Sequence, residues 1–215
     1  MALVQQGLMP ETAFWAAWSA LTGRPIPSQG AAPAPTYPDN LSPTTLPTWL
    51  AHPWAALCSE DHPRVKLHWL VDTAELVVRW TVAVALAEVV HAHDGSLPEK
   101  VARAIAEHIE RPTLGRWLAI LRALCDAAPT DPVVTRGLFA WSTESLQPQF
   151  QGENKGGTLE TSLLVLRNQV AHGGGMARAK AEALVERHLP TLTGLLEGAR
   201  DALAGASLMA DGVQL

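Results

Sequence analysis

The sequence contains few cysteines, few charged residues and no excess of basic residues. Its two cysteines, Cys58 and Cys125, have no C-x-x-C partner, so we interpret both as reduced thiols and Cys125 as a core side chain. Charged residues make up 17% of the 215 residues, against an average of about 25%. The formal net charge of −5 provides no general basic field for nucleic acid, although a small local basic site remains compatible with it.

The sequence also lacks a secretory signal and a long apolar run. Residues 1–21 have no basic n-region and no clear cleavage site, and they include Glu11. A membrane span needs roughly 18 apolar residues. The longest candidate, residues 67–90, is interrupted by four charged side chains: Asp72, Glu75, Arg79 and Glu88. We therefore expect a cytoplasmic protein with no membrane partner.

Sequence motifs for cofactors and metals are missing as well. No glycine-rich phosphate loop, no H-E-x-x-H and no G-x-S-x-G occurs. His91 and His93 have a spacing that can bind a metal, but no third ligand follows at a useful distance. The pair is better interpreted as cationic residues at the C-terminal end of a helix, where positive charge is favourable. The sequence predicts no metal site and no cofactor.

Apolar residues recur at helical spacing through most of the chain, and no segment alternates as a strand would. The longest predicted helix spans residues 63–92 and starts at Pro63, because proline is favourable in a first turn. It is apolar on most of its surface after Leu76, which predicts a central position. Further helices are predicted over residues 98–110, 112–127, 132–145, 158–172, 176–187 and 189–204, the last two separated at Pro190. These elements predict an all-α, up-and-down helical bundle.

Composition predicts four segments along the chain. Residues 1–22 form a short Trp-rich helix that must dock on the main body or on a partner protein. Residues 23–55 hold eight of the sixteen prolines and predict an extended connector. Apolar residues indicate that its far end packs on the core: Leu46, Trp49, Leu50 and Trp54. The bundle follows over residues 56–206, and residues 207–215 are a tail from which the native chain could continue into a longer protein.

Residues 158–175 combine an apolar helical stripe with a polar cluster and a run of glycines. The stripe consists of Leu159, Leu163, Leu166 and Val170. At about 100° per residue, Asn168 and His172 point roughly away from this stripe, and Arg167 flanks it. Gly173 begins the glycine run and is predicted to end the helix with a positive φ, since glycine readily adopts that conformation.

The run from Arg167 through Asn168 and His172 to Gly173 resembles the R-N-x-x-x-H-G signature of the HEPN superfamily (higher eukaryotes and prokaryotes nucleotide-binding). The resemblance is close over this segment and loose over the rest, where it rests on helical character. It implies an all-helical bundle of HEPN type. Many members dimerise and cut RNA without a metal, and many serve in prokaryotic defence or toxin–antitoxin systems. The spacing alone is weak evidence, because Arg103 and His108 share it without the Asn and the Gly.

These residue types suit metal-independent RNA cleavage. A histidine such as His172, with an ordinary pKa of about 6.5, can give or take a proton near neutral pH. Arg167 would bind phosphate oxygens in a bidentate way, and Asn168 would orient the imidazole or bond the phosphate. Attack by the 2′-OH would leave a 2′,3′-cyclic phosphate and a 5′-OH. Asn154 and Lys155, in the preceding polar loop, could reach the phosphate or simply belong to a mobile loop.

The alternative is a non-catalytic dimerisation or protein-interaction module, a role that some HEPN members have. The acidic charge and the Trp-rich N-terminal segment favour it, and an ion pair with Glu160 would make Arg167 structural. Asp72 is a candidate to orient the site, or else a surface charge. Arg167 and His172 are about 140° apart on a regular helix. We therefore expect a homodimer, or pairing with a second such domain, in which a two-fold contact assembles one composite site.

Overall fold

The computed structural model describes residues 37–38, 41–111, 113–132, 137–151, 162–172, 176–202, 209–210 and 213–214. The chain divides into two compact units, residues 1–35 and 36–215, and every described residue belongs to the second. The predicted N-terminal helix and most of the predicted connector therefore lie outside the described residues.

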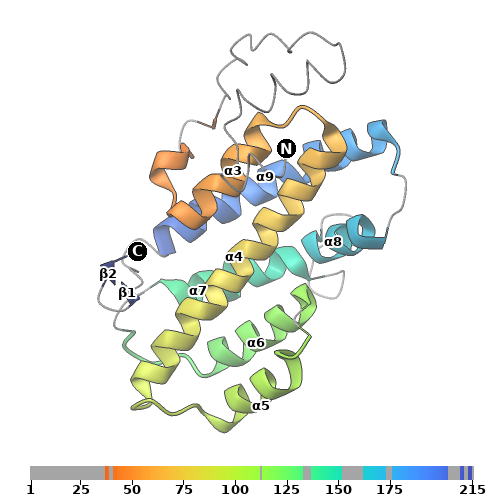
Figure 1. The fold of residues 1–215 in the computed structure, drawn as a ribbon. Coiled ribbons are helices and arrows are strands. Elements are labelled where there is room, and N and C mark those ends of the chain that lie inside the picture. The colour runs from red at the N-terminus through yellow and green to blue at the C-terminus, as the bar shows by residue number, and fades with distance from the viewer. Residues whose placement is uncertain are drawn as a thin grey trace, which may run out of the picture. The chain divides into compact units, whose positions relative to one another are not determined.

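The described unit is all-α, as the sequence predicts (Figure 1). Its helices are α3 (Thr48–Ser59), α4 (Pro63–Ala92), α5 (Glu99–His108), α6 (Leu114–Asp126), α7 (Leu138–Trp141), α8 (Leu163–His172) and α9 (Arg178–Ala202). Three short helical segments are η1 (Pro43–Thr45), η2 (Ser142–Leu146) and η3 (Gln147–Phe150). Two two-residue strands, β1 (Met209–Ala210) and β2 (Val213–Gln214), pair antiparallel. The HEPN type of the bundle stays a prediction.

Helix α4 is the central element and has the bounds that the sequence predicts. It packs against α3, α6, α8 and α9, and Figure 1 shows it crossing the unit between them. The helix ends at Ala92 because Asp94 and Gly95 take left-handed φ values of 52° and 84°. His93 Nδ1 lies 2.8 Å from the carbonyl oxygen of Val89, which supports the interpretation of His93 as a helix-end residue.

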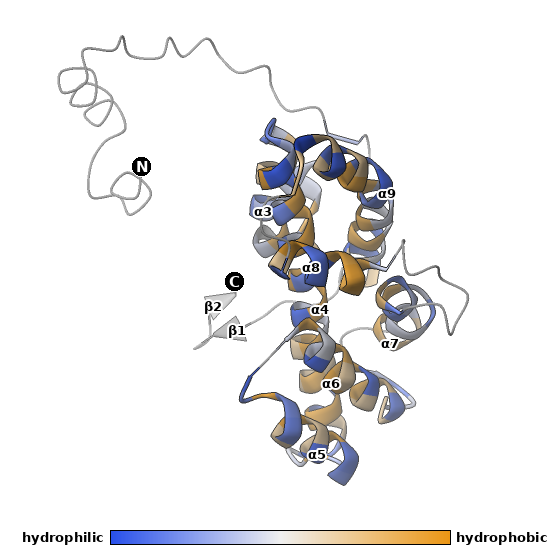
Figure 2. Cartoon of the chain, turned by 90° about the vertical axis from the view of Figure 1, so that its right-hand side faces the viewer, coloured by the Kyte–Doolittle hydropathy of each residue, from blue (hydrophilic) through white to orange (hydrophobic). Residues whose placement is uncertain are grey.

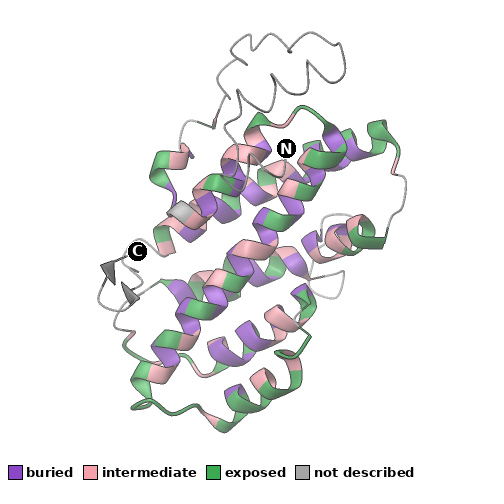
Figure 3. Ribbon diagram, in the orientation of Figure 1, coloured by how far each residue is buried: buried purple, intermediate pink, exposed green. Residues whose placement is uncertain are grey.

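The core surrounds α4. Figure 3 shows buried residues along the whole of this helix, whereas α5 is exposed along most of its length. Apolar side chains of the neighbouring helices complete the core, and Figure 2 shows the hydrophobic sides of the helices facing one another. Fully buried leucines come from four helices: Leu50 and Leu57 of α3, Leu70 of α4, Leu121 and Leu124 of α6, and Leu192 and Leu196 of α9.

Helix α3 differs from the prediction, which assigned residues 23–55 to an extended connector. The helix starts at Thr48 and continues through Pro53. Proline inside a helix costs about 3 kcal/mol or more, because it removes a backbone hydrogen bond. Burial offsets this cost: Leu50 is fully buried, and each such side chain contributes about 1.5–3 kcal/mol. Trp54 Nε1 also donates a 2.7 Å hydrogen bond to the carbonyl of Leu41, so the predicted packing of this end on the core is confirmed.

Helix α9 is also longer than predicted. The sequence predicts two helices separated at Pro190, but the helix is continuous from Arg178 to Ala202. Residues on both sides of the proline are buried, among them Leu184 and Leu192, and α9 packs extensively on α4. Packing along the whole length therefore keeps the helix continuous, although Pro190 has no backbone N–H to donate and one hydrogen bond is missing.

The segment predicted as a helix over residues 132–145 has a different form. Residues 133–136 lie outside the described residues, and α7 begins at Leu138. The chain then continues through a π-helical turn and a 3-10 turn to Phe150, where the sequence predicts a polar loop from Gln147. Leu146 and Phe150 are buried, so packing extends the helical path beyond the point where the polar sequence begins.

Candidate functional site

Helix α8 carries the motif and packs on α4. Leu163 and Leu166 are each 2% exposed, and Val170 is partly buried against the core. The backbone N–H of Leu166 donates to the carbonyl of Ser162, and that of Val165 to the Ser162 hydroxyl, which satisfies amide groups at the start of the helix. The predicted apolar stripe is thus confirmed for its described members, while Leu159 lies outside them.

Arg167 makes an ion pair with a residue of the central helix. Its Nε lies 3.6 Å from Oε2 of Glu75, and its side chain is 27% exposed. The other oxygen of Glu75, Oε1, accepts a 2.5 Å hydrogen bond from Arg79 Nη2. The guanidinium of Arg79 also lies 5.9 Å from the ring centroid of Trp117, within cation–π range. Glu75 therefore balances two guanidinium groups, one on α4 and one on α8.

Asn168 and His172 are exposed, and they follow Arg167 on the side of α8 away from the core. Asn168 is uncharged, and His172 makes no ion pair with another described residue. Because Arg167 and His172 are about 140° apart on the helix, one copy of the chain does not bring them together. The structure thus holds the arginine against α4 and leaves the amide and the imidazole facing solvent.

Four of the predicted site residues lie outside the described residues. These are Asn154, Lys155, Glu160 and Gly173. The predicted ion pair between Glu160 and Arg167 and the predicted positive φ of Gly173 therefore stay predictions.

Asp72 lies one helical turn before Glu75 on α4, and its side chain is exposed. Neighbouring protein atoms nevertheless remove part of its hydration, and this desolvation raises the pKa of Asp72. The charge of Glu75 adds to the rise, whereas His68, Arg79 and Arg167 oppose it. The net effect of these neighbours and of desolvation is a raised pKa for this carboxylate.

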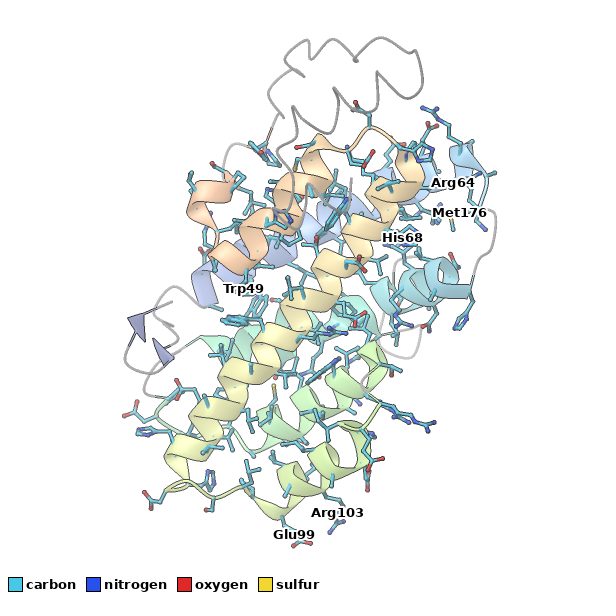
Figure 4. The ribbon with its side chains drawn as sticks, in the orientation of Figure 1. Trp49, Arg64, His68, Glu99, Arg103 and Met176 are labelled. Atoms are coloured by element: carbon cyan, nitrogen blue, oxygen red, sulfur yellow. The ribbon has the colours of Figure 1, made fainter. Side chains whose placement is uncertain are left out.

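A pocket of about 500 Å³ lies where α3 and α4 meet. It is lined by Trp49, His52 and Pro53 of α3 and by Trp69, Asp72, Glu75, Leu76 and Arg79 of α4. Trp49 extends from α3 toward α4 (Figure 4) and stacks on Trp80, with ring centroids 4.4 Å apart and planes tilted by 32°. The ring of His52 meets Trp69 edge-on at 6.2 Å. Both tryptophans of the lining are thus braced by a second ring.

Sequence reasoning missed this pocket. Trp49 and Pro53 fall in the segment predicted as an extended connector, whose far end was expected to pack on the core but not to form a helix that lines a pocket with α4. A signal was present in α4, where Trp69, Asp72 and Arg79 recur at spacings that share one helix face. An aromatic and charged stripe on a helix that is mostly apolar after Leu76 indicates a surface that could bind a ligand.

Two further features of the described part of the chain bear on the kind of site. No group of three His, Cys, Asp or Glu side chains in these residues gathers where it could hold a metal ion. Among the same residues, no helix combines the length and the apolar character that crossing a bilayer requires.

Comparisons with protein-family models, with curated proteins and with solved structures find no match to this chain.

Proposed function

We propose that the chain is a metal-independent endoribonuclease of HEPN type, with a role in bacterial antiviral defence or a toxin–antitoxin system. The observation that carries the proposal is the arrangement of α8. Asn168 and His172 are exposed on the side away from the core, and an ion pair with Glu75 holds Arg167 in place on the same helix. These are the residues of the R-N-x-x-x-H-G motif, and the exposed side of the helix is open to a long polymeric substrate.

The proposed reaction is an internal transesterification. The 2′-oxygen loses its proton and forms a bond to phosphorus, while the bond from phosphorus to the 5′-oxygen breaks and that oxygen gains a proton. His172 would transfer these protons, and Arg167 would stabilise the negative charge on the phosphate oxygens. Asn168 would hold the imidazole or a phosphate oxygen. Glu75 would keep the guanidinium of Arg167 at a defined position, because its Oε2 is 3.6 Å from Nε.

A second copy of the chain completes the proposed site. The polar side of α8 is exposed, so a two-fold contact along it would place two Arg167 and two His172 side chains around one cleft. Two histidines would allow one to act as base and the other as acid. Four potentially cationic groups would also concentrate positive charge locally on a chain whose formal net charge is −5.

One observation favours the second candidate, a non-catalytic dimerisation or interaction module of a larger assembly. Glu75 already balances the charge of Arg167, so the arginine has a structural partner without any substrate. In that case Arg167 would join α8 to α4, and the exposed residues of α8 would belong to a protein interface.

Labelled structured RNA, incubated with the full chain in EDTA, distinguishes the two candidates. The endoribonuclease proposal predicts fragments with 2′,3′-cyclic phosphate ends and their loss in His172→Ala. The matched control is His108→Ala, because Arg103 and His108 repeat the spacing on α5, where Arg103 pairs with Glu99 at 2.6 Å (Figure 4). The control should cut like the wild type.

Light scattering on the same variants tests the composite site. His172→Ala should stay a dimer, since the change removes an exposed ring and no core contact. A monomer that cuts RNA at the wild-type rate would refute the two-fold site. A wild-type chain that forms a dimer but cuts none of many RNAs would favour the interaction module.

A further inference from the structure

The pocket between α3 and α4 is lined by charged side chains that take no direct part in the proposed cleavage of RNA. Three charged side chains line it, namely Asp72, Glu75 and Arg79. Glu75 is paired twice, with Arg79 at 2.5 Å and with Arg167 at 3.6 Å. Asp72 makes no ion pair with any residue of the described part of the chain. Asp72 is therefore the one carboxylate of the lining that has no ion-pair partner among the described residues.

Arg79 has two partners of its own in the described part of the chain. Its Nη2 donates to Glu75, and its guanidinium lies 5.9 Å from the ring centroid of Trp117, a residue outside the pocket lining. A cationic ligand at Asp72 would therefore meet an arginine whose charge is already engaged by a carboxylate and an aromatic ring.

Aromatic side chains form the walls around this carboxylate. Trp49 is held by its stack on Trp80, and Trp69 is held by the edge-on contact with His52. Rings held in this way would lose little conformational entropy on binding a ligand, and tryptophan is the best of the aromatic side chains for binding a cation. Pro53 and Leu76 add apolar surface that would contact alkyl groups.

We propose that the pocket between α3 and α4 binds an organic ammonium group, which sits against Trp49 and Trp69 and forms an ion pair with Asp72. A volume of about 500 Å³ falls in the usual range for small-molecule sites, roughly 300–1,000 Å³. The ligand class includes choline-like compounds and methylated amines, for which aromatic walls and a carboxylate are the ordinary recognition groups.

The desolvation of Asp72 supports the same assignment. Loss of hydration raises the pKa of this carboxylate although its side chain stays exposed, so its charged form is under-solvated at this position. A cation placed beside it would supply the stabilisation that water no longer provides. A neutral or anionic ligand would not, and an anion would also be repelled by Asp72.

Choline and its neutral carbon isostere, 3,3-dimethyl-1-butanol, form a matched pair of probes with nearly the same shape. Binding to the full chain is measured by calorimetry and by tryptophan fluorescence. Choline should bind at least about tenfold more tightly than the isostere, because only choline has a charge for the rings and Asp72 to recognise. Equal binding of the two compounds, or binding of neither, would overturn the proposal.

Two variants locate the binding. Asp72→Asn keeps the shape of the side chain and should remove most of the preference for choline over the isostere. Asp61→Asn, in the loop between α3 and α4 and absent from the pocket lining, changes the net charge equally and should keep the preference. If both variants lose the preference for choline, the loss follows from the change in net charge and the proposed site is refuted.

A third variant tests the aromatic wall. Trp69→Leu should weaken the binding of choline and leave the binding of the isostere little changed, provided that the circular-dichroism spectrum of the variant matches that of the wild type. A nucleotide such as AMP should not compete with choline. Competition by AMP, or choline binding unchanged in Trp69→Leu, would contradict the assignment.

Discussion

Glu75 of α4 bridges Arg79 of its own helix and Arg167 of α8, with one carboxylate oxygen for each. Its side chain is only 13% exposed, whereas those of the two arginines are 47% and 27% exposed. The carboxylate is therefore the least exposed member of a three-residue ionic network. Such a network is worth more than a surface pair, because removing its centre leaves two guanidinium groups without a partner close to the protein interior.

Glu75→Gln should lower the free energy of unfolding by about 1–3 kcal/mol, since the remaining amide cannot balance two arginines. Glu99→Gln is the matched control, because Glu99 pairs with Arg103 on α5 while both side chains are highly exposed. It should cost less than about 1 kcal/mol. Urea titration measures both. Equal losses in the two variants would mean that the network contributes no more than a surface ion pair.

Gly198 of α9 lies against the indole of Trp141. A Cβ atom at this position would clash with Trp141 Nε1, so Gly198→Ala requires a shift of a large, partly buried ring. We expect the free energy of unfolding to fall by about 1–3 kcal/mol, as it does at other overpacked sites. Gly194→Ala on the same helix meets nothing within 4 Å and should stabilise by up to about 1 kcal/mol through helix propensity. Thermal unfolding that ranks the two variants in the opposite order would contradict this packing.

Asp72 should make stability depend on pH in an unusual direction. Its pKa is raised in the folded chain, chiefly by desolvation, so the folded state binds a proton more readily than the unfolded state. Its contribution to stability is therefore largest at low pH and is lost as the pH rises above about 3.9, the ordinary value for aspartate. Asp72→Asn should raise the melting temperature at pH 7 and have less effect near pH 3. A lower melting temperature at pH 7 would refute the desolvation.

Cys58 should react slowly with alkylating reagents. Burial raises the pKa of its thiol from 9.0 to about 11, and Lys66 opposes only part of this rise. The reactive thiolate is therefore scarce at pH 8 and should increase as the pH approaches 11. Mass spectrometry after iodoacetamide treatment of a Cys125→Ser variant follows this residue alone. Urea should accelerate the reaction, and a native rate equal to the urea rate at pH 8 would contradict the assignment.

Local sequence patterns predicted the helices whose start and end are marked by residues close to those points in the sequence. The bounds of α4 follow from Pro63 at its start and the Asp94-Gly95 turn at its end, and both signals act within a few residues. Proline was misleading for the same reason. The local penalty at Pro53 and Pro190 predicted breaks, but burial against distant helices outweighs it in α3 and α9.

The candidate site likewise has one part that spacing along the sequence predicts and another part that depends on the fold. The position of Arg167 beside the apolar stripe and the pair between Glu75 and Arg79 both follow from spacing along one helix. The contact between Arg167 and Glu75 joins two helices that are far apart in the sequence, so periodicity carries no information about it. The pocket needed in addition the fold of α3, because Trp49 faces α4 only once its segment is helical.

The double pairing of Glu75 has one more consequence, which concerns thermodynamic linkage. One carboxylate belongs to the lining of the pocket and to the anchor of α8, so neither place is electrically independent of the other. A phosphate that draws Arg167 away would leave Glu75 with a single counter-ion and make the pocket more negative. An ammonium ion would then bind more tightly, and by reciprocity the phosphate would bind more tightly to a chain whose pocket is filled.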